Sequence, residues 1–263
     1  MRTLLPLVMV GVVAACDGSS TEAGPSPAPT SSASDSSAPI PVPKDSGAKD
    51  AGPHGGEALR KCAESKGAIG SIAEAITRLN TLAPNGDGPC FVATLPRPLA
   101  VVATLGSTSA QPAGGRGAPR LFFMLPKIVI SAVPAGDGSK VLEFGEWVGS
   151  TRTIKGEVAL PVTAPVAADA AFSRVLQGTD RTTCATCHRQ EEKHPTITNA
   201  FISLAFKPEP GTFVTVEELE ELHTLCTQAD DPGSRCTMIH ALFDFGEITQ
   251  GSFSPAVATF LVP

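Results

Sequence analysis

Apolar and polar positions follow a helical period at the start of the region that can fold. Ile69, Ile72, Ala73, Ile76 and Leu79 recur at spacings of three and four residues. This pattern places the apolar side chains on one face of a helix. We therefore expect helix within residues 56–80.

From Cys90 to about Leu160 the pattern becomes that of strands. Short apolar runs such as "LAVVATL", "RLFFML" and "KIVISAV" are bounded by proline and glycine. Near residue 155, apolar residues alternate with Lys155 and Glu157, as expected when one face of a strand packs on a core. Residues 56–165 are therefore predicted to form an N-terminal helix followed by antiparallel sheet.

After Pro165 the helical period returns. Thr215 and Glu218 have the spacing of a capping box at a helix N-terminus. Apolar stripes follow over residues 216–226 and 238–245, and Gly246 is a typical helix stop. The expected fold class is α+β, with a β-rich region over residues 56–165 and a helical region over residues 166–263.

The N-terminal residues predict export. Arg2 precedes an apolar run over residues 4–15 that is too short to span a bilayer. The run ends in Val-Ala-Ala followed by Cys16, which resembles the lipobox of bacterial lipoproteins. The resemblance implies that residues 1–15 are removed and that Cys16 is acylated. The chain would then be anchored to lipid on the periplasmic or outer face of a bacterial membrane. An ordinary secretory signal with an incidental cysteine is the alternative.

Composition separates the next segment from the rest of the chain. Residues 16–55 consist mainly of Ser, Pro, Ala and Gly, with little to bury, and are expected to form a disordered tether. The whole chain has a formal net charge of −6 and no basic run, which argues against a nucleic-acid partner.

The candidate chemistry lies in the stretch Cys184-Ala-Thr-Cys187-His188. This CxxCH sequence is rarely expected by chance in a chain with seven cysteines and five histidines. It resembles the haem-attachment motif of c-type cytochromes. The resemblance implies one covalent haem c, with Cys184 and Cys187 as thioether anchors, His188 as an iron ligand and a haem-c-like C-terminal half. It covers only five residues, and Asp180 stands where small soluble cytochromes usually have an aromatic residue.

The function that this resemblance implies is electron transfer, or that of a haem-bearing accessory subunit, with a redox protein as a partner. A different class also fits: a non-haem envelope lipoprotein that binds a partner, with its C-terminal cysteines disulfide-bonded. Zinc held by Cys184, Cys187, Cys226 and Cys236 is a third reading, although the spacing between the last two is long for paired zinc ligands. No acid–base constellation favours an enzyme.

Four further cysteines suggest two disulfides in an oxidising compartment. The simplest pairing joins Cys62 to Cys90 and Cys226 to Cys236, each closing a local loop. Three connectivities are possible.

The sixth ligand of a haem iron has several candidates. Met238 is the first, because it follows His188 at a separation compatible with His/Met cytochromes. His223, His240 and His194 are the others. A sixth position that no side chain fills would indicate binding or sensing of a small ligand.

Overall fold

The computed structural model describes residues 56–229, 231 and 233–260. The expected signal peptide, Cys16 and the tether lie outside these residues. The helices are α1 (Gly56–Ala63), α2 (Ile72–Leu82), α3 (Gly88–Ala93), α4 (Ala170–Val175), α5 (Val216–Ala229) and α6 (Ser234–Phe243). The strands are β1 (Leu99–Thr104), β2 (Arg120–Met124), β3 (Ile128–Ala132), β4 (Val141–Trp147), β5 (Arg152–Ala159), β6 (Leu176–Gln177), β7 (Arg181–Thr182), β8 (Glu192–Lys193), β9 (Phe201–Leu204), β10 (Phe206–Lys207), β11 (Phe213–Val214), β12 (Ile248–Gln250) and β13 (Ala258–Thr259). Short 3-10 turns cover Asp137–Lys140, Thr183–Thr186 and Pro210–Thr212.

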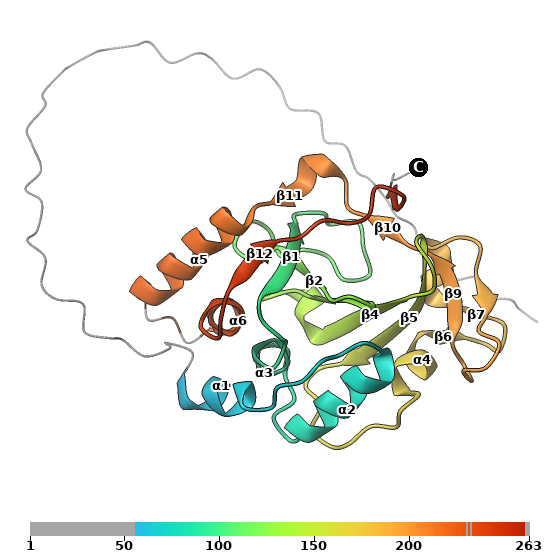
Figure 1. Cartoon of the computed structure of the whole chain (residues 1–263), viewed down its shortest axis with the longest axis horizontal. Helices are drawn as coiled ribbons and strands as arrows, with labels where there is room; N and C mark the ends of the chain where they lie inside the picture. The colour runs from blue at the N-terminus through green and yellow to red at the C-terminus, as the bar shows by residue number, and fades with distance from the viewer. Residues whose placement is uncertain (1–55, 230, 232, 261–263) are drawn as a thin grey trace, which may run out of the picture. The chain divides into compact units, whose positions relative to one another are not determined.

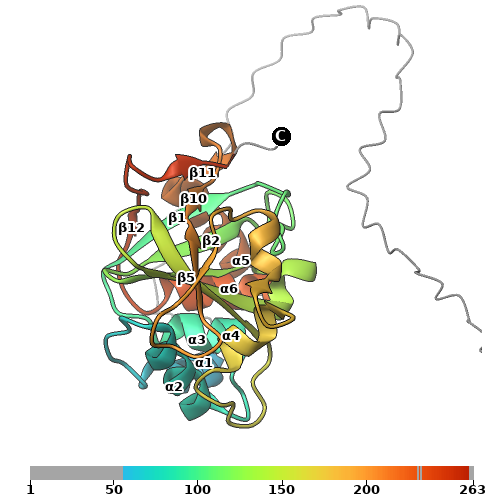
Figure 2. The ribbon, with the colours of Figure 1, turned by 90° about the vertical axis from the view of Figure 1, so that its right-hand side faces the viewer.

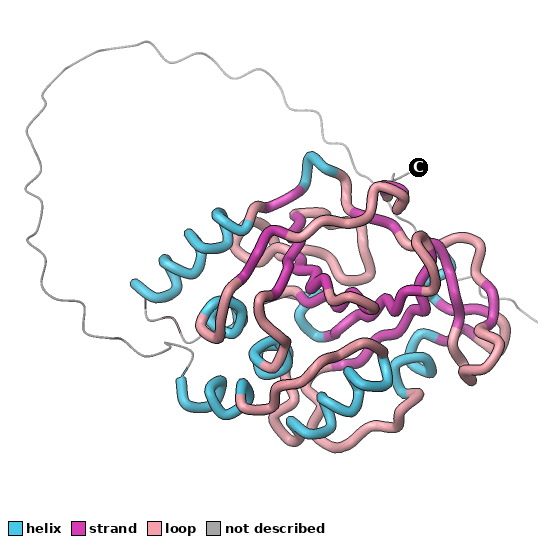
Figure 3. The backbone as a smooth tube through the Cα atoms, in the orientation of Figure 1, coloured by secondary structure: helices cyan, strands magenta, loops and turns pink. Residues whose placement is uncertain are grey.

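A nine-stranded sheet forms the centre of the described region. Its order is β11-β1-β2-β3-β4-β5-β9-β8, and β12 also pairs with β1. Strands β1 to β5 run as consecutive antiparallel neighbours, as expected from short strands joined by turns. Within this sheet only the β12–β1 pair is parallel, and β10 and β13 form a separate two-stranded parallel pair. Figure 3 shows the strands running through the middle of the molecule with helices around them.

The main core lies between helices and one face of this sheet. Figure 1 shows α1, α2 and α3 gathered on one side of the strands. Alternate residues of the strands, such as Leu121, Phe123 and Ile154, are buried in the same cluster as Ile76 and Phe91 of the helices. Side chains of a strand alternate between the two faces of a sheet. The intervening residues therefore point to the opposite face, which carries the site described below.

The predicted helical signals are confirmed in part. The N-terminal pattern forms two helices, α1 and α2, and the Ser71 side chain caps α2 by accepting a hydrogen bond from the Glu74 amide. The capping box of α5 is present: the Thr215 amide donates to the Glu218 carboxylate (2.8 Å), and the Glu218 amide donates to Thr215 Oγ1 (3.1 Å).

The expectation of a helical, haem-c-like C-terminal half was wrong. Strands β8, β9, β11 and β12 all come from residues after 190, and they extend the same sheet that β1 to β5 begin. Strand β9 pairs with β5, and β11 pairs with β1. The fold is therefore a mixed one, in which a central antiparallel sheet takes strands from both halves of the chain. These late strands contain only two to four residues, which is too short for an alternating pattern to show in the sequence.

Both disulfides of the simplest predicted pairing are present. Cys62 of α1 is bonded to Cys90 of α3, and Cys226 of α5 is bonded to Cys236 of α6. Each bond joins two helices that are near neighbours in the chain. Among the described helices, none has both the length and the apolar character needed to cross a bilayer.

Candidate functional site

A cavity of about 420 Å³ opens on the sheet face that the core helices leave uncovered. Its floor consists of alternate residues of β2 to β5, including Arg120, Phe122, Ser131, Glu143 and Lys155. The sequence pattern marked Lys155 as facing away from the core, and the structure shows that this side of the strand lines the cavity. The size falls within the range of small-molecule and cofactor sites.

Aromatic side chains from the end of the chain form much of the other wall. Phe206 of β10, Phe253 and Phe260 all line the cavity. Phe253 packs edge-on against Phe122 of the floor, with ring centroids 5.4 Å apart, and Phe206 packs against Phe260 at 5.7 Å. In Figures 1 and 2, β10 lies at the opposite end of the molecule from α1, α2 and α3. The cavity is thus closed by segments that follow the motif in the chain.

The CxxCH motif lies in the wall of this cavity. Cys184, Cys187 and His188 all line it, and both cysteines are unpaired thiols. The amides of Cys187 and His188 donate to the Cys184 carbonyl, at 3.2 and 2.8 Å. These bonds wind the motif into a single turn after β7, so that the three side chains reach one cavity.

His188 is held in one orientation. Its Nδ1 lies 2.8 Å from the Leu204 carbonyl oxygen, and its ring packs against Phe206 with centroids 5.5 Å apart. A carbonyl oxygen can only accept, so Nδ1 carries the proton and Nε2 keeps its lone pair. Burial, with the charge of Lys155 as a smaller contribution, lowers the pKa of His188 to about 3. The imidazole is therefore neutral above that pH, as a metal ligand must be.

The charged residues of the floor form a connected group. Arg120 donates to the Glu143 carboxylate (2.6 Å) and to Ser131 Oγ (3.0 Å), and its guanidinium lies 4.7 Å from the centre of the Phe122 ring. Although Lys155 as a whole is half-buried, burial of its ammonium group lowers its pKa to about 8.

The two motif cysteines differ in their surroundings. Burial raises the pKa of the Cys184 thiol, and the hydrogen bond from Thr182 only partly opposes that effect. Cys187 is exposed. A buried thiol with a raised pKa is a poor thiolate ligand at neutral pH. Since Cys226 and Cys236 are bonded to each other, the four-cysteine zinc site of the sequence analysis is not formed.

The structure does not bring the candidates for a sixth ligand to the cavity. Met238 is buried in α6 and belongs to the core cluster, and its methyl group packs at Gly88 of α3. His223 and His240 meet each other between α5 and α6. His194 accepts hydrogen bonds from the amides of two residues in its own loop. The cavity lining includes none of these four residues.

Sequence reasoning missed the polar residues of the floor. Arg120, Glu143 and Lys155 lie on three different strands, and only the strand register brings them together. The available signal was a charged residue inside each of three strand-like runs, on the face away from the core.

Comparison with known proteins returns no match: neither a family model, nor a curated protein, nor a solved structure resembles this chain.

Proposed function

We propose that the chain is an exported, lipid-anchored protein that carries one c-type haem in this cavity. Cys184 and Cys187 would hold the haem through thioether bonds, and His188 Nε2 would bind the iron. The observation that carries the proposal is that all three motif side chains line one cavity, with the His188 ring already fixed in the tautomer that a metal requires.

The other residues of the cavity fit such a group. Phe122, Phe206, Phe253 and Phe260 offer apolar and aromatic surface to a flat macrocycle. The other four cysteines within residues 56–260 form two disulfides, whereas the motif pair stays as thiols. Disulfides are also compatible with an exported chain. When bound, the haem would supply one-electron and small-ligand chemistry, and the protein would supply its attachment, orientation and exclusion of water.

The cavity supports a particular role for the iron. Among the described residues that line it, His188 is the only histidine, and methionine is absent. A His/Met electron carrier needs a second ligand from the chain, and Met238 lies in the core instead. We therefore favour a haem that would bind a small ligand at its iron over a simple electron carrier. Arg120, Glu143 and Lys155 are the charged groups of the cavity floor that would be available to such a ligand.

The test is expression of the full chain together with the machinery that attaches haem c. We expect intact-protein mass spectrometry to show one covalent haem, and the denatured protein to give a haem-dependent peroxidase band. A Cys184→Ala/Cys187→Ala double variant should lose both signals. The matched control is Cys226→Ser/Cys236→Ser, which removes as many cysteines away from the cavity and should keep the haem.

The open iron face has its own measurement. Reduced protein should bind carbon monoxide with a shift of its main visible absorption band, and a Met238→Leu variant should have the same spectrum as the native chain. A spectrum of methionine ligation that Met238→Leu abolishes would contradict the open face while leaving haem attachment intact.

The non-haem lipoprotein is the second candidate, and the two structural disulfides fit it. It predicts that peptide mapping of the exported chain finds Cys184 bonded to Cys187, with no tetrapyrrole attached. That result would remove the haem proposal altogether.

A further inference from the structure

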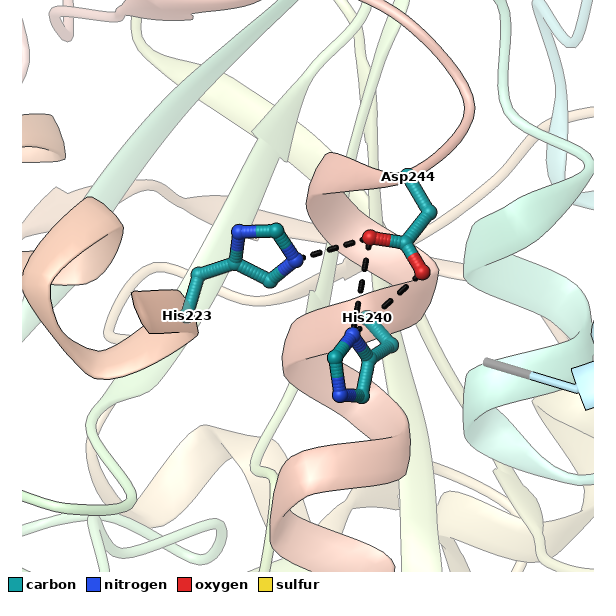
Figure 4. A group of neighbouring side chains, drawn as sticks. All are labelled: His223, His240 and Asp244. Carbon is teal, nitrogen blue, oxygen red and sulfur yellow. Dashed lines mark hydrogen bonds and ion pairs between the residues drawn. The ribbon is translucent and has the colours of Figure 1, made fainter. Parts of the chain in front are cut away.

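A second group of ligating side chains lies between α5 and α6. His223 is one turn before Cys226 on α5, and His240 is one turn after Cys236 on α6. Asp244 follows His240 by another turn, at the end of α6. The Cys226–Cys236 disulfide joins the two helices. It therefore holds the turn that contains His223 opposite the turn that contains His240. This placement brings the three side chains into one cluster (Figure 4).

The ligand atoms of this cluster converge. His223 Nε2 lies 2.7 Å from Asp244 Oδ1, and His240 Nδ1 lies 3.3 Å from Asp244 Oδ2. The two imidazole rings are 5.1 Å apart, centre to centre, and nearly perpendicular. One ligand atom can be chosen from each residue so that all lie within 4.8 Å of one another. Figure 4 shows both rings turned toward the carboxylate.

This geometry is close to that of a tetrahedral metal site. With zinc–ligand bonds of about 2.0–2.1 Å, neighbouring ligand atoms are about 3.4 Å apart. Measured to the same oxygen, Asp244 Oδ1, His223 Nε2 lies at 2.7 Å and His240 Nδ1 at 3.5 Å, one on each side of this value. Small side-chain movements would make the three separations equal. Two imidazoles and a carboxylate are donors that zinc accepts readily.

We propose that His223, His240 and Asp244 bind one divalent transition-metal ion, with zinc as the best match. The ligands are His223 Nε2, His240 Nδ1 and a carboxylate oxygen of Asp244. A water molecule takes the fourth position. This site is separate from the haem cavity, because the cavity lining includes none of the three residues. The inference therefore does not depend on the proposed function.

Burial and packing support a built site. The side chains of His240 and Asp244 are 6% and 5% exposed, whereas that of His223 is 27% exposed. The ion would thus be enclosed on the α6 side and reachable from solvent past His223. The His223 ring also stacks on Phe243, with centroids 5.2 Å apart, which fixes its orientation. A ring that packing holds in place loses less freedom when it binds a metal.

The expected role is structural. A metal that binds the folded chain but not the unfolded chain raises stability in proportion to the logarithm of its concentration. It would join α5 to α6 at a second point, one turn beyond the disulfide.

The test is zinc titration of the purified full chain by isothermal calorimetry, with zinc content measured after dialysis. We expect one zinc per chain in addition to any haem iron, and a melting temperature that zinc raises and a chelator lowers again. His223→Ala should weaken zinc binding about 100-fold or more, because loss of an outer-shell partner alone costs about 10–100-fold and this variant removes a ligand. Because His223 is the most exposed of the three, this variant should remain folded, as its far-ultraviolet circular dichroism would show. Asp244→Asn, which keeps the side chain's shape, should also weaken binding.

The matched control is Glu221→Gln, which removes a charge from the same helix two residues before His223. It should bind zinc like the native chain. If the native chain binds no zinc, or if His223→Ala and Glu221→Gln bind it equally well, the cluster is a hydrogen-bonded contact between helices and the proposal is wrong.

Discussion

Lys155 on the cavity floor makes the native chain less stable than it would be with a neutral side chain there. Burial lowers its pKa from 10.5 to about 8; Cys184 and Glu143 oppose this effect, and Arg120 adds to it. A group whose charged form is disfavoured in the folded state reduces stability wherever the unfolded chain is protonated. We therefore expect Lys155→Met, which keeps the length and apolar stem of the side chain, to stabilise the fold.

The size of the effect follows from the pKa. At about 1.36 kcal/mol per pH unit, a pKa lowered from 10.5 to about 8 corresponds to about 3.4 kcal/mol below pH 8. Solvent in the cavity reduces this figure, so we expect Lys155→Met to gain about 1–2 kcal/mol at neutral pH. Between pH 8 and 10.5 the folded chain has released the proton while the unfolded chain still holds it. Lys155 should therefore make the native chain more stable as the pH rises over this window. Lys155→Met has no such group and should not show this rise.

The assay is urea unfolding of the native chain and of Lys155→Met at about pH 7 and at about pH 9.5. The stability difference between them should fall by more than half at the higher pH. Lys127→Met is the matched control, since Lys127 is exposed in the turn between β2 and β3 and should change stability little at either pH. A Lys155→Met variant that is less stable than the native chain at neutral pH, or a difference that does not change with pH, would refute the reasoning.

Three other changes should lower the free energy of unfolding, each measured by urea denaturation. Replacing Cys62 and Cys90 by serine opens a loop with a sequence separation of 28 residues and should cost about 3.6 kcal/mol; equal stability of the native chain with and without reductant would contradict this. Gly138→Ala should cost about 1–3 kcal/mol, because its Cβ would lie 2.5 Å from a backbone oxygen, whereas Gly211→Ala has open space and should be neutral. Arg97→Met should cost about 1.5–3 kcal/mol, because the Arg97 guanidinium donates to two carbonyls at the end of α6, at 3.0 and 3.1 Å; a neutral effect would show that water replaces these bonds.

Local signals in the sequence predicted local structure well. The Thr215–Glu218 capping box is formed, and both predicted disulfides close loops between segments near in the chain. Each of these depends on residues within about one loop of each other. The strand alternation around Lys155 was also right, because it depends only on which face packs on the core.

What the sequence could not show depends on long-range pairing. Strands β11 and β12 have two and three residues, and only β1, more than a hundred residues earlier, gives them their place. The helical period of α6 correctly placed Met238 on the apolar face of its helix. It could not show that this face packs into the main core and not against the cavity. The charged residues of the cavity floor could not be predicted for the same reason. They lie on three strands, and only the register of the sheet brings them together.

The order in which the chain supplies the two walls of the cavity has a consequence for assembly. The floor comes from β2 to β5, whereas Phe206, Phe253 and Phe260 of the aromatic wall come after the CxxCH motif. Neighbouring antiparallel strands pair early, while the parallel pairing of β12 with β1 must close a very long loop. We expect that, at an early stage of folding, the CxxCH motif lies beside a cavity whose aromatic wall has not yet formed. A large planar group could then enter the cavity from that side. Pulse-labelled hydrogen exchange would then find the β12 amides protected later than the amides of β2 to β5.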